Sequence, residues 1–284
     1  MKKSILLLIV LVLSSSAIFA QSLLLKISGK NVKDPSYLLG TIHILYQDSV
    51  PIFEKAKALL PHCKTYALEV KMENSLAMLS MVNQMTLPDN KSIQDYLSTE
   101  EYISLTQYLN QNAKIPIDFV KKFQPIIIQA FIEMNTLDNK DSTDALYMDI
   151  ALQSQAKKKK LKVEGLETMN EQMSSLLSIP LEEQVQALKE FIHADSIKLV
   201  DLSTSLYMKN DVALLYDYLI KQMSPTEIQN LLDERNERML ARMIPLLADK
   251  PTLVAVGAGH LGGENGLINL LRKKGYKVED VVLE

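Results

Sequence analysis

Two short stretches, more than two hundred residues apart, follow one pattern. "YLLGTIHIL" (37–45) and "LVAVGAGHL" (253–261) each place an apolar run before a glycine, with a histidine three residues after that glycine. An uninterrupted apolar run of this length is typical of a strand buried on both faces. The pattern therefore predicts two buried strands that end alike, which a helical bundle does not provide and a covered sheet does.

Strand-like runs gather at the two ends of the chain, and helical periodicity fills the middle. We expect strands at 22–28, 36–44, 65–70, 161–168, 252–260 and 276–284, and helices at 50–60, within 72–155, at 181–247 and at 265–274. Turn-forming residues fill positions 29–35, so the first two strands should form a hairpin. The final strand, helix and strand predict a βαβ unit.

These patterns predict an α/β fold with a mixed central β-sheet, built from the N- and C-terminal parts of the chain, and a large helical middle region. We expect residues 21–284 to form a single domain, with a helical insertion at about 72–160. The apolar content of 47% is enough for a sizeable core. Cys63 is the only cysteine, so no internal disulfide supports the fold.

The first twenty residues have the order of a secretory signal peptide: lysines, an apolar run over 5–13, then small residues. Cleavage after Ala20 is expected, with Ala17 as the alternative, and the mature protein should be periplasmic or secreted. The run is shorter than the roughly 20 residues of a membrane-spanning helix, so no stable span should remain after cleavage. An uncleaved, membrane-anchoring N-terminus is the other reading. A formal net charge of −3 gives no electrostatic argument for nucleic acid.

His43 and His260 follow the two buried strands, where ligands gather in α/β sheets. Gly40 and Gly257 would allow a close approach of the backbone at these ends. Glu69 closes the apolar run "YALE" and would need a cation, a metal or water as its partner. Two imidazoles and a carboxylate suit a divalent ion with open positions for water. The alternatives are core histidines satisfied by carbonyls and a glutamate turned into solvent.

Arg235 and Asn236 lie on a predicted helix, with Arg238 three residues after Arg235. Such a helix can aim a guanidinium and an amide at an anion or at a substrate carbonyl. A charged, exposed helix face explains the same residues. Glu167 can equally be a helix cap, and Asp144 carries no sharper indication.

The segments "YLLGTIHIL", "ALEV", "VEGLET", "ERNERM" and "VGAGHLGGENGLINLLRKKGYKV" together resemble the TraB/GumN family, in the family order and over nearly the whole mature chain. The family is distantly similar to haem-binding ChaN proteins and erythromycin esterases, and it includes the Tiki proteins, which resemble metal-dependent proteases. One departure is the absence of tryptophan, since "KKFQP" stands where the family often has a tryptophan. The resemblance implies a site made of Gly40, His43, Glu69, Arg235, Asn236, Gly257 and His260.

Two functions stay open. The first is an exported metal-dependent hydrolase, a peptidase before other classes, that acts on a peptide or small-molecule substrate. His43, Glu69 and His260 would hold a divalent metal, manganese or cobalt by resemblance, while Arg235 and Asn236 steady the oxyanion. The second is a non-catalytic periplasmic binding protein that sequesters a peptide or a haem-like ligand. The His-Glu-x-x-His and Gly-x-Ser-x-Gly motifs of two common hydrolase classes are absent from the sequence.

Overall fold

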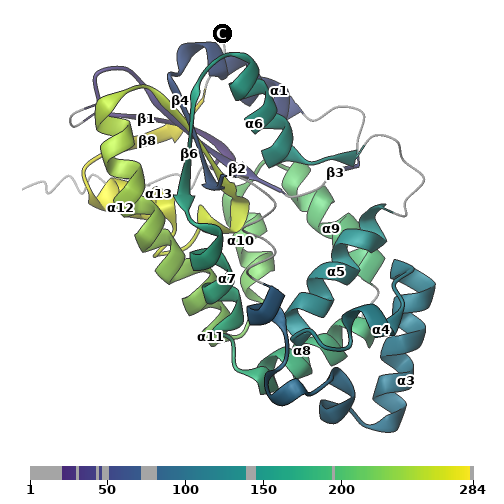
Figure 1. Cartoon of the computed structure of the whole chain (residues 1–284). Coiled ribbons are helices and arrows are strands. Elements are labelled where there is room, and N and C mark those ends of the chain that lie inside the picture. The colour runs from purple at the N-terminus through teal and green to yellow at the C-terminus, as the bar shows by residue number, and fades with distance from the viewer. Residues whose placement is uncertain are drawn as a thin grey trace, which may run out of the picture.

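The computed structural model describes residues 21–29, 32–42, 45–46, 51–71, 82–138, 145–193 and 196–281. A helix-covered sheet stands beside a lobe built of helices (Figure 1). The predicted signal peptide, His43 and Asp144 lie outside the described residues. No helix in the described ranges is long and apolar enough to cross a membrane.

The central sheet has six strands in the order β6-β4-β7-β2-β1-β8. Its strands are β1 (Leu24–Ser28), β2 (Ser36–Thr41), β4 (Thr65–Val70), β6 (Lys162–Glu167), β7 (Thr252–Gly257) and β8 (Lys277–Asp280). β1 runs antiparallel to both of its neighbours, and the remaining pairs are parallel. The mixed sheet drawn from both ends of the chain is therefore confirmed, as is the first hairpin. A separate two-stranded sheet pairs β3 (Leu45–Tyr46) with β5 (Ala145–Leu146).

β2 and β7, the two strands with the shared sequence pattern, lie side by side and parallel. Their register pairs Gly40 with Val256 and Thr41 with Gly257, so they end at the same edge of the sheet. β7 is three residues shorter than predicted, because the chain turns at Gly257 into a short 3₁₀ helix, η6 (Ala258–His260). A Cβ on Gly40 would lie 2.7 Å from Leu261 Cδ1 and 3.1 Å from Ala258 Cα, so only glycine lets η6 pack this closely.

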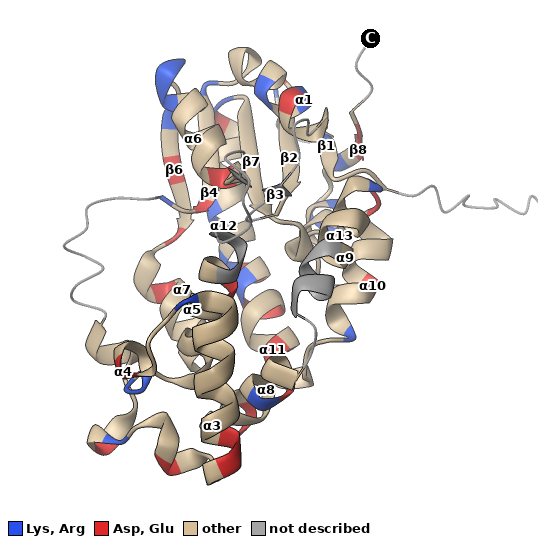
Figure 2. Ribbon diagram, turned by 90° about the vertical axis from the view of Figure 1, so that its right-hand side faces the viewer, with Lys and Arg blue, Asp and Glu red and all other residues tan. Residues whose placement is uncertain are grey.

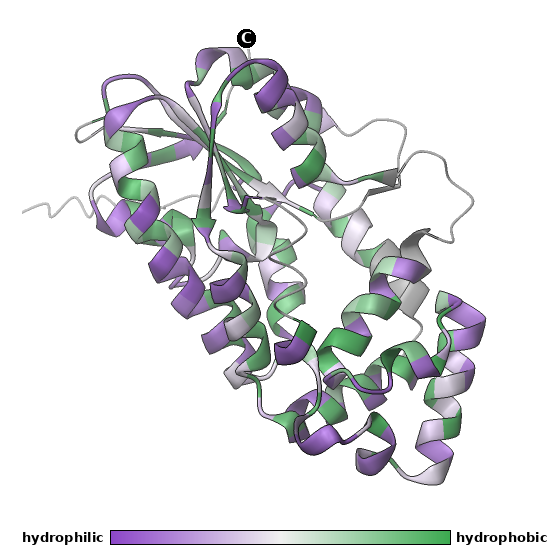
Figure 3. Cartoon of the chain, viewed as in Figure 1, coloured by the Kyte–Doolittle hydropathy of each residue, from purple (hydrophilic) through white to green (hydrophobic). Residues whose placement is uncertain are grey.

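Helices cover both faces of the sheet (Figure 1). α12 (Glu234–Asp249) packs on β4, β6 and β7, whereas α6 (Met148–Lys158) packs on β4 and β6 from the other side. β7 and most of β4, which lie between them, are hydrophobic and buried (Figure 3). The other helices on this side of the molecule are α1 (Pro51–Leu59), α7 (Met169–Leu177), α9 (Ser196–Met208), α10 (Val212–Ile220) and α13 (Leu267–Lys273), while α11 (Pro225–Glu227) lies beside α8 (Leu181–His193).

A second hydrophobic core lies in the helical lobe. It is formed by α3 (Thr99–Tyr108), α4 (Ile117–Val120), α5 (Pro125–Asp138) and α8 (Leu181–His193), with the short helices around residues 88–96 and 109–113. Leu105 and Leu109 are fully buried in it, and Leu188 of α8 joins them. The predicted insertion spans about 72–160; in the structure α8, from beyond that range, completes the second core, while α6, from within it, packs on the sheet.

Candidate functional site

Glu69 lies near the end of β4, and its carboxylate reaches the end of β7. Its Oε1 atom accepts a hydrogen bond from the backbone N–H of Gly257 at 2.6 Å. A Cβ at position 257 would lie 3.1 Å from the same oxygen, closer than nearly all real Cβ contacts. The glycine therefore exposes its N–H to the carboxylate and leaves room for it, which gives this motif glycine a physical reason.

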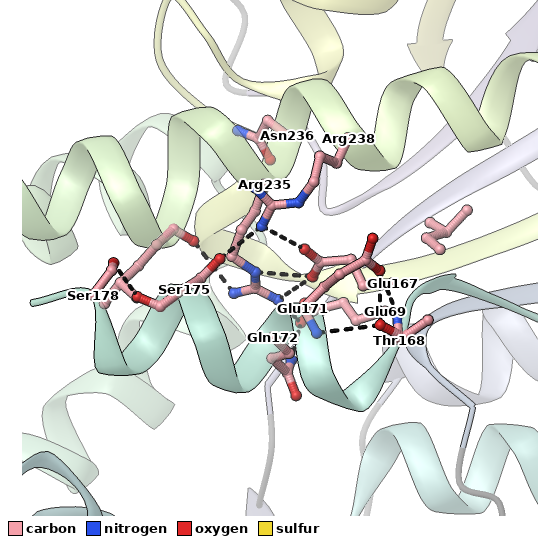
Figure 4. A network of polar contacts seen from close by, with 12 residues as sticks. Glu69, Glu167, Thr168, Glu171, Gln172, Ser175, Ser178, Arg235, Asn236 and Arg238 are labelled. Atoms are coloured by element: carbon pink, nitrogen blue, oxygen red, sulfur yellow. Dashed lines mark hydrogen bonds and ion pairs between the residues drawn. The ribbon is translucent and has the colours of Figure 1, made fainter. Parts of the chain in front are cut away.

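The other carboxylate oxygen of Glu69 is held by two side chains. Arg235 Nη2 donates to Oε2 at 2.7 Å, and Gln172 Nε2 of α7 donates to it at 3.1 Å (Figure 4). The Glu69 side chain is 14% exposed, so these are largely desolvated contacts. Donors from α7, α12 and β7 thus fix both the charge and the orientation of this carboxylate.

His260, in η6, is buried and is oriented by Asn236. Its Nδ1 atom lies 2.8 Å from Asn236 Oδ1, while Asn236 Nδ2 donates to the backbone carbonyl of Asn265 at 2.9 Å. Because a carbonyl can only accept, the amide nitrogen of Asn236 must face Asn265 and its oxygen must face His260. The ring therefore carries a proton on Nδ1, and its Nε2 atom is turned toward Glu69.

His260 Nε2 lies 3.6 Å from Glu69 Oε1. Two ligands that bind one ion at about 2.1 Å in a tetrahedral arrangement lie about 3.4 Å apart, so this pair fits a divalent metal. The fixed Nδ1–H is also the arrangement of a metal-binding histidine, whose other nitrogen donates to an oxygen. Within the described ranges, no group of three or more His, Cys, Asp or Glu side chains could hold an ion. A complete ligand set needs a further residue, and His43 lies outside those ranges.

Arg235 is anchored by a second carboxylate, Glu167. Its Nε and Nη2 atoms lie 2.9 Å and 2.7 Å from Glu167 Oε2, and its Nη1 atom donates to the carbonyl of Leu231. Burial opposes the charge of the guanidinium, but Glu69 and Glu167 outweigh that cost, and the pKa of Arg235 is raised. The Glu167 side chain is fully buried and also contacts Arg238 at 3.1 Å.

Glu167 is not the helix cap that its sequence context allowed. The cap of α7 is Thr168, whose hydroxyl accepts from the N–H of Glu171 while the Glu171 carboxylate accepts from the N–H of Thr168. Arg242 binds the Glu171 carboxylate through two nitrogens, at 2.7 and 2.6 Å. Arg242 and the N–H of Thr168 together lower the pKa of Glu171 to about 2.

The arginines that face these carboxylates follow an irregular helical segment. α11 continues into a π-helical segment, η5 (Ile228–Asp233), and α12 follows directly. Arg235 is the second residue of α12. π-Helical turns occur frequently at functional sites. Arg235, Arg238 and Arg242 are spaced by three and four residues, which places them on one face of α12.

Sequence reasoning did not find Gln172, Glu171 or Arg242. The spacing of the three arginines was a usable signal, because it places them on one face of a helix, where they can pair with carboxylates from another part of the chain. The Thr-x-x-Glu capping box at 168–171 was another. Gln172 had no signal, because its role depends on how α7 packs beside β4. The structure brings together Glu69, Arg235, Asn236, Gly257 and His260.

Comparison with known proteins shows which family and which relatives the chain is similar to. The family model described as TraB/PrgY/gumN matches residues 23–280. The chain is 25% identical over 303 residues to "Metalloprotease TIKI2" of Xenopus tropicalis, with 86% of this chain and 57% of that protein covered. It is 23% identical over 302 residues to "Metalloprotease TIKI1" of Danio rerio, with 86% and 60% covered.

The chain therefore spans about three fifths of the length of these relatives. No solved structure gave a significant match. The family match extends over the described sheet and both cores, from β1 to β8. The chain belongs to the TraB/PrgY/gumN family.

Proposed function

We propose that the chain is an exported, metal-dependent peptidase whose reaction centre lies at Glu69 and His260. The observation that carries the proposal is the 3.6 Å approach of His260 Nε2 to Glu69 Oε1, with the opposite side of the ring fixed as an N–H donor. The similarity to proteins named metalloproteases supports the same reaction class. The leading segment over residues 1–20 supports export.

Glu69 Oε1 and His260 Nε2 would hold the ion, and His43, which follows β2, is the third proposed ligand. Glu69 Oε2 is held by Arg235 and Gln172, so Glu69 would bind through one oxygen. A bound divalent ion supplies a polarised scissile carbonyl and a water of lowered pKa. Manganese or cobalt is proposed as the ion from the family resemblance.

Arg235 and Asn236 take positioning roles in this proposal. The sequence suggested that they steady an oxyanion, but their contacts are with Glu69, Glu167, His260 and the backbone. Asn236 uses its oxygen for the Nδ1–H of His260 and thereby keeps the lone pair of Nε2 directed at the proposed ion. Arg235 balances the charges of two carboxylates and sets the orientation of Glu69.

The test is hydrolysis of a peptide library by the mature protein, with and without added manganese or cobalt. His43→Ala, His260→Ala and Glu69→Gln are compared with wild type, and Lys57→Ala on the exposed surface of α1 serves as a control. Glu69→Gln keeps the shape of the side chain and removes its charge. Loss of a proton-transfer or charge-stabilising group typically lowers the rate by about 10²–10⁴-fold.

We expect metal-dependent cleavage that is lost in the three site variants and retained in Lys57→Ala. Cleavage that survives all three substitutions would place the reaction elsewhere in the chain. A wild-type protein that cleaves nothing with either metal, yet binds peptide or haem through His43 and His260, would favour the sequestering function.

A further inference from the structure

A cavity of about 670 Å³ lies at the far end of α7 from the candidate site. Its volume is within the range of about 300–1,000 Å³ of small-molecule pockets, and it is broadly open to the surface. Leu177 and Ser178 line it from the end of α7, Leu87 from the opposite wall, and Ile179 and Leu181 from the connection to α8. The cavity thus joins the sheet region to the helical lobe.

The side chains that line the cavity carry no formal charge. They are apolar or neutral and polar: Asn83, Thr86, Leu87, Pro88, Gln124, Leu177, Ser178, Ile179, Pro180, Leu181 and Gln184. An ionised group brought into it would lose hydration without gaining a counter-charge from this lining. The cavity therefore suits an uncharged side chain.

The polar groups of this lining are largely used within the protein. Gln184 Nε2 donates to the carbonyl of Ile179 at 2.7 Å and to Gln124 Oε1 at 3.2 Å. Gln124 Nε2 in turn donates to the carbonyl of Gln84 at 3.1 Å. These bonds hold the two walls in place and leave shape and the exclusion of charge as the basis of selection.

α7 connects the cavity with the candidate site. The helix begins directly after Thr168, beside Glu167, and Gln172 on its second turn binds Glu69. Met169, Met173 and Leu177 share one face at spacings of four residues, and each is partly exposed. The opposite wall follows α7, since Gln84 Nε2 lies 3.4 Å from Asn170 Oδ1 while Thr86 and Leu87 line the cavity.

The separation matches a short piece of extended chain. α7 has nine residues and rises about 13 Å at roughly 1.5 Å per residue. An extended peptide covers about 3.3 Å per residue, so about four residues bridge the same length. Of the possible occupants, a peptide is the one whose other end would reach Glu69 and His260.

We propose that this cavity is a substrate subsite that takes an uncharged side chain of an extended peptide, about four residues from the bond that is cleaved. The inference rests on the proposed peptidase function and deepens it. Specificity would then come from the junction with the helical lobe, while the reaction takes place at the edge of the sheet.

The test places a charge in the cavity. Leu177→Lys puts an ammonium group into it, and Ser174→Lys puts the same group on an exposed position of the same helix as a matched control. Asn83→Lys adds a charge from the opposite wall, where the native residue is exposed. Circular dichroism checks that the variants are folded, and Asn83→Lys replaces Leu177→Lys in the test if the latter is unfolded.

Two readouts separate the subsite from the reaction. Anisotropy measures binding of fluorescein-labelled Gly/Ser peptides that carry a single Leu, Glu or Lys. Cleavage rates are measured for ten-residue peptides in which the residue four places from the cleaved bond is varied in the same way. For wild type we expect the Leu peptides to be favoured by about tenfold or more, as expected for burial of one apolar side chain.

In Leu177→Lys we expect the preference for Leu to be lost and the Glu peptides to gain, while Ser174→Lys keeps the wild-type order. Equal behaviour of these two variants would overturn the subsite, and cleavage that persists in both would leave the peptidase function standing. A chain that cleaves no peptide, but whose binding order changes only in Leu177→Lys, would overturn the peptidase function and keep the cavity as a peptide-binding site.

Discussion

The edge of the sheet and the helical lobe bury polar groups in opposite ways. At the sheet, Glu167 is fully buried as an ion, and the side chains of Arg235 and Glu69 are 10% and 14% exposed. In the lobe, the buried polar side chain Gln184 is neutral, and the carboxylate of Glu101 caps α3 at the surface. Figure 2 shows that the acidic residues of the lobe lie on its outer helices and turns.

The difference supports the proposal that the reaction centre lies at the edge of the sheet. Taking ions out of water costs several kcal/mol for each ion, and a buried pair often adds no stability over apolar residues of equal size. The charged network at the sheet is therefore better explained by the fixed placement of Glu69 than by stability. The described part of the lobe contains no comparable network of buried charges. Its apolar core packs behind the wall of the cavity beside α7.

The largest expected effect is on Arg235. Arg235→Ala leaves Glu167 buried with only Arg238 beside it, and breaking a buried pair in this way costs about 3–5 kcal/mol in the free energy of unfolding. Urea denaturation measures this value. Adding Glu167→Gln to the variant should restore part of the stability, because the unpaired charge is then removed. A loss below 1 kcal/mol would mean that water reaches the network.

Leu105→Ala tests the lobe. Leu105 is fully buried in the second core, and its truncation should lower the free energy of unfolding by about 2–5 kcal/mol. Because the lobe carries no proposed metal ligand, metal affinity per folded molecule should be unchanged, as measured by calorimetric titration well below the melting temperature. A large fall in metal affinity would break the division between the two regions.

Asn236 offers a smaller change at the sheet edge. Asn236→Ala removes the acceptor that holds the proton on His260 Nδ1, and loss of such a partner typically lowers metal affinity by about 10–100-fold. Asn236→Asp retains an acceptor for that N–H and should bind metal more tightly than Asn236→Ala. The same titration compares them. Equal affinity in the two variants would mean that the contact does not orient the ring.

The smallest effect concerns the Glu171–Arg242 pair. The folded-state pKa of Glu171, about 2, lies below its ordinary value of 4.5. The carboxylate therefore stabilises the fold above pH 4.5, and this contribution is lost as the pH falls toward 2. Since the pair is partly exposed, Glu171→Gln should cost about 1 kcal/mol at pH 7. Urea denaturation at pH 7, 4 and 2.5 should show the difference from wild type shrinking at the lowest pH.

The sequence predicted the sheet better than it predicted the contacts at its edge. Apolar runs long enough to be buried on both faces correctly predicted β2 and β7. The structure places these two strands, which share the Gly-x-x-His pattern, side by side. Glu69 and His260, which the sequence analysis assigns to one site, lie 3.6 Å apart in the structure. That His43 shares this site with His260 stays a prediction, because His43 lies outside the described residues.

Contacts between elements distant in sequence were harder to predict. The sequence around Glu167, at the end of a strand, is compatible with a helix cap. Its contacts with Arg235 and Arg238 depend on the packing of α12, which no local sequence pattern predicts. The same holds for Asn236, whose partner is 24 residues away in the chain. An asparagine that contacts a substrate and an asparagine that orients a histidine look alike in a sequence. Only the contact between α12 and η6 shows that Asn236 faces His260.

Cobalt binding tests the central claim most directly, namely that Glu69 and His260 share one divalent ion. Co²⁺ is titrated into the mature wild-type protein and into His43→Ala, His260→Ala and Glu69→Gln, and the visible absorption of the bound ion is followed. We expect a saturable spectrum from a single ion per chain in wild type, and its loss or strong weakening in all three variants. An unchanged spectrum in His260→Ala and Glu69→Gln, or no saturable spectrum in wild type, would contradict the account.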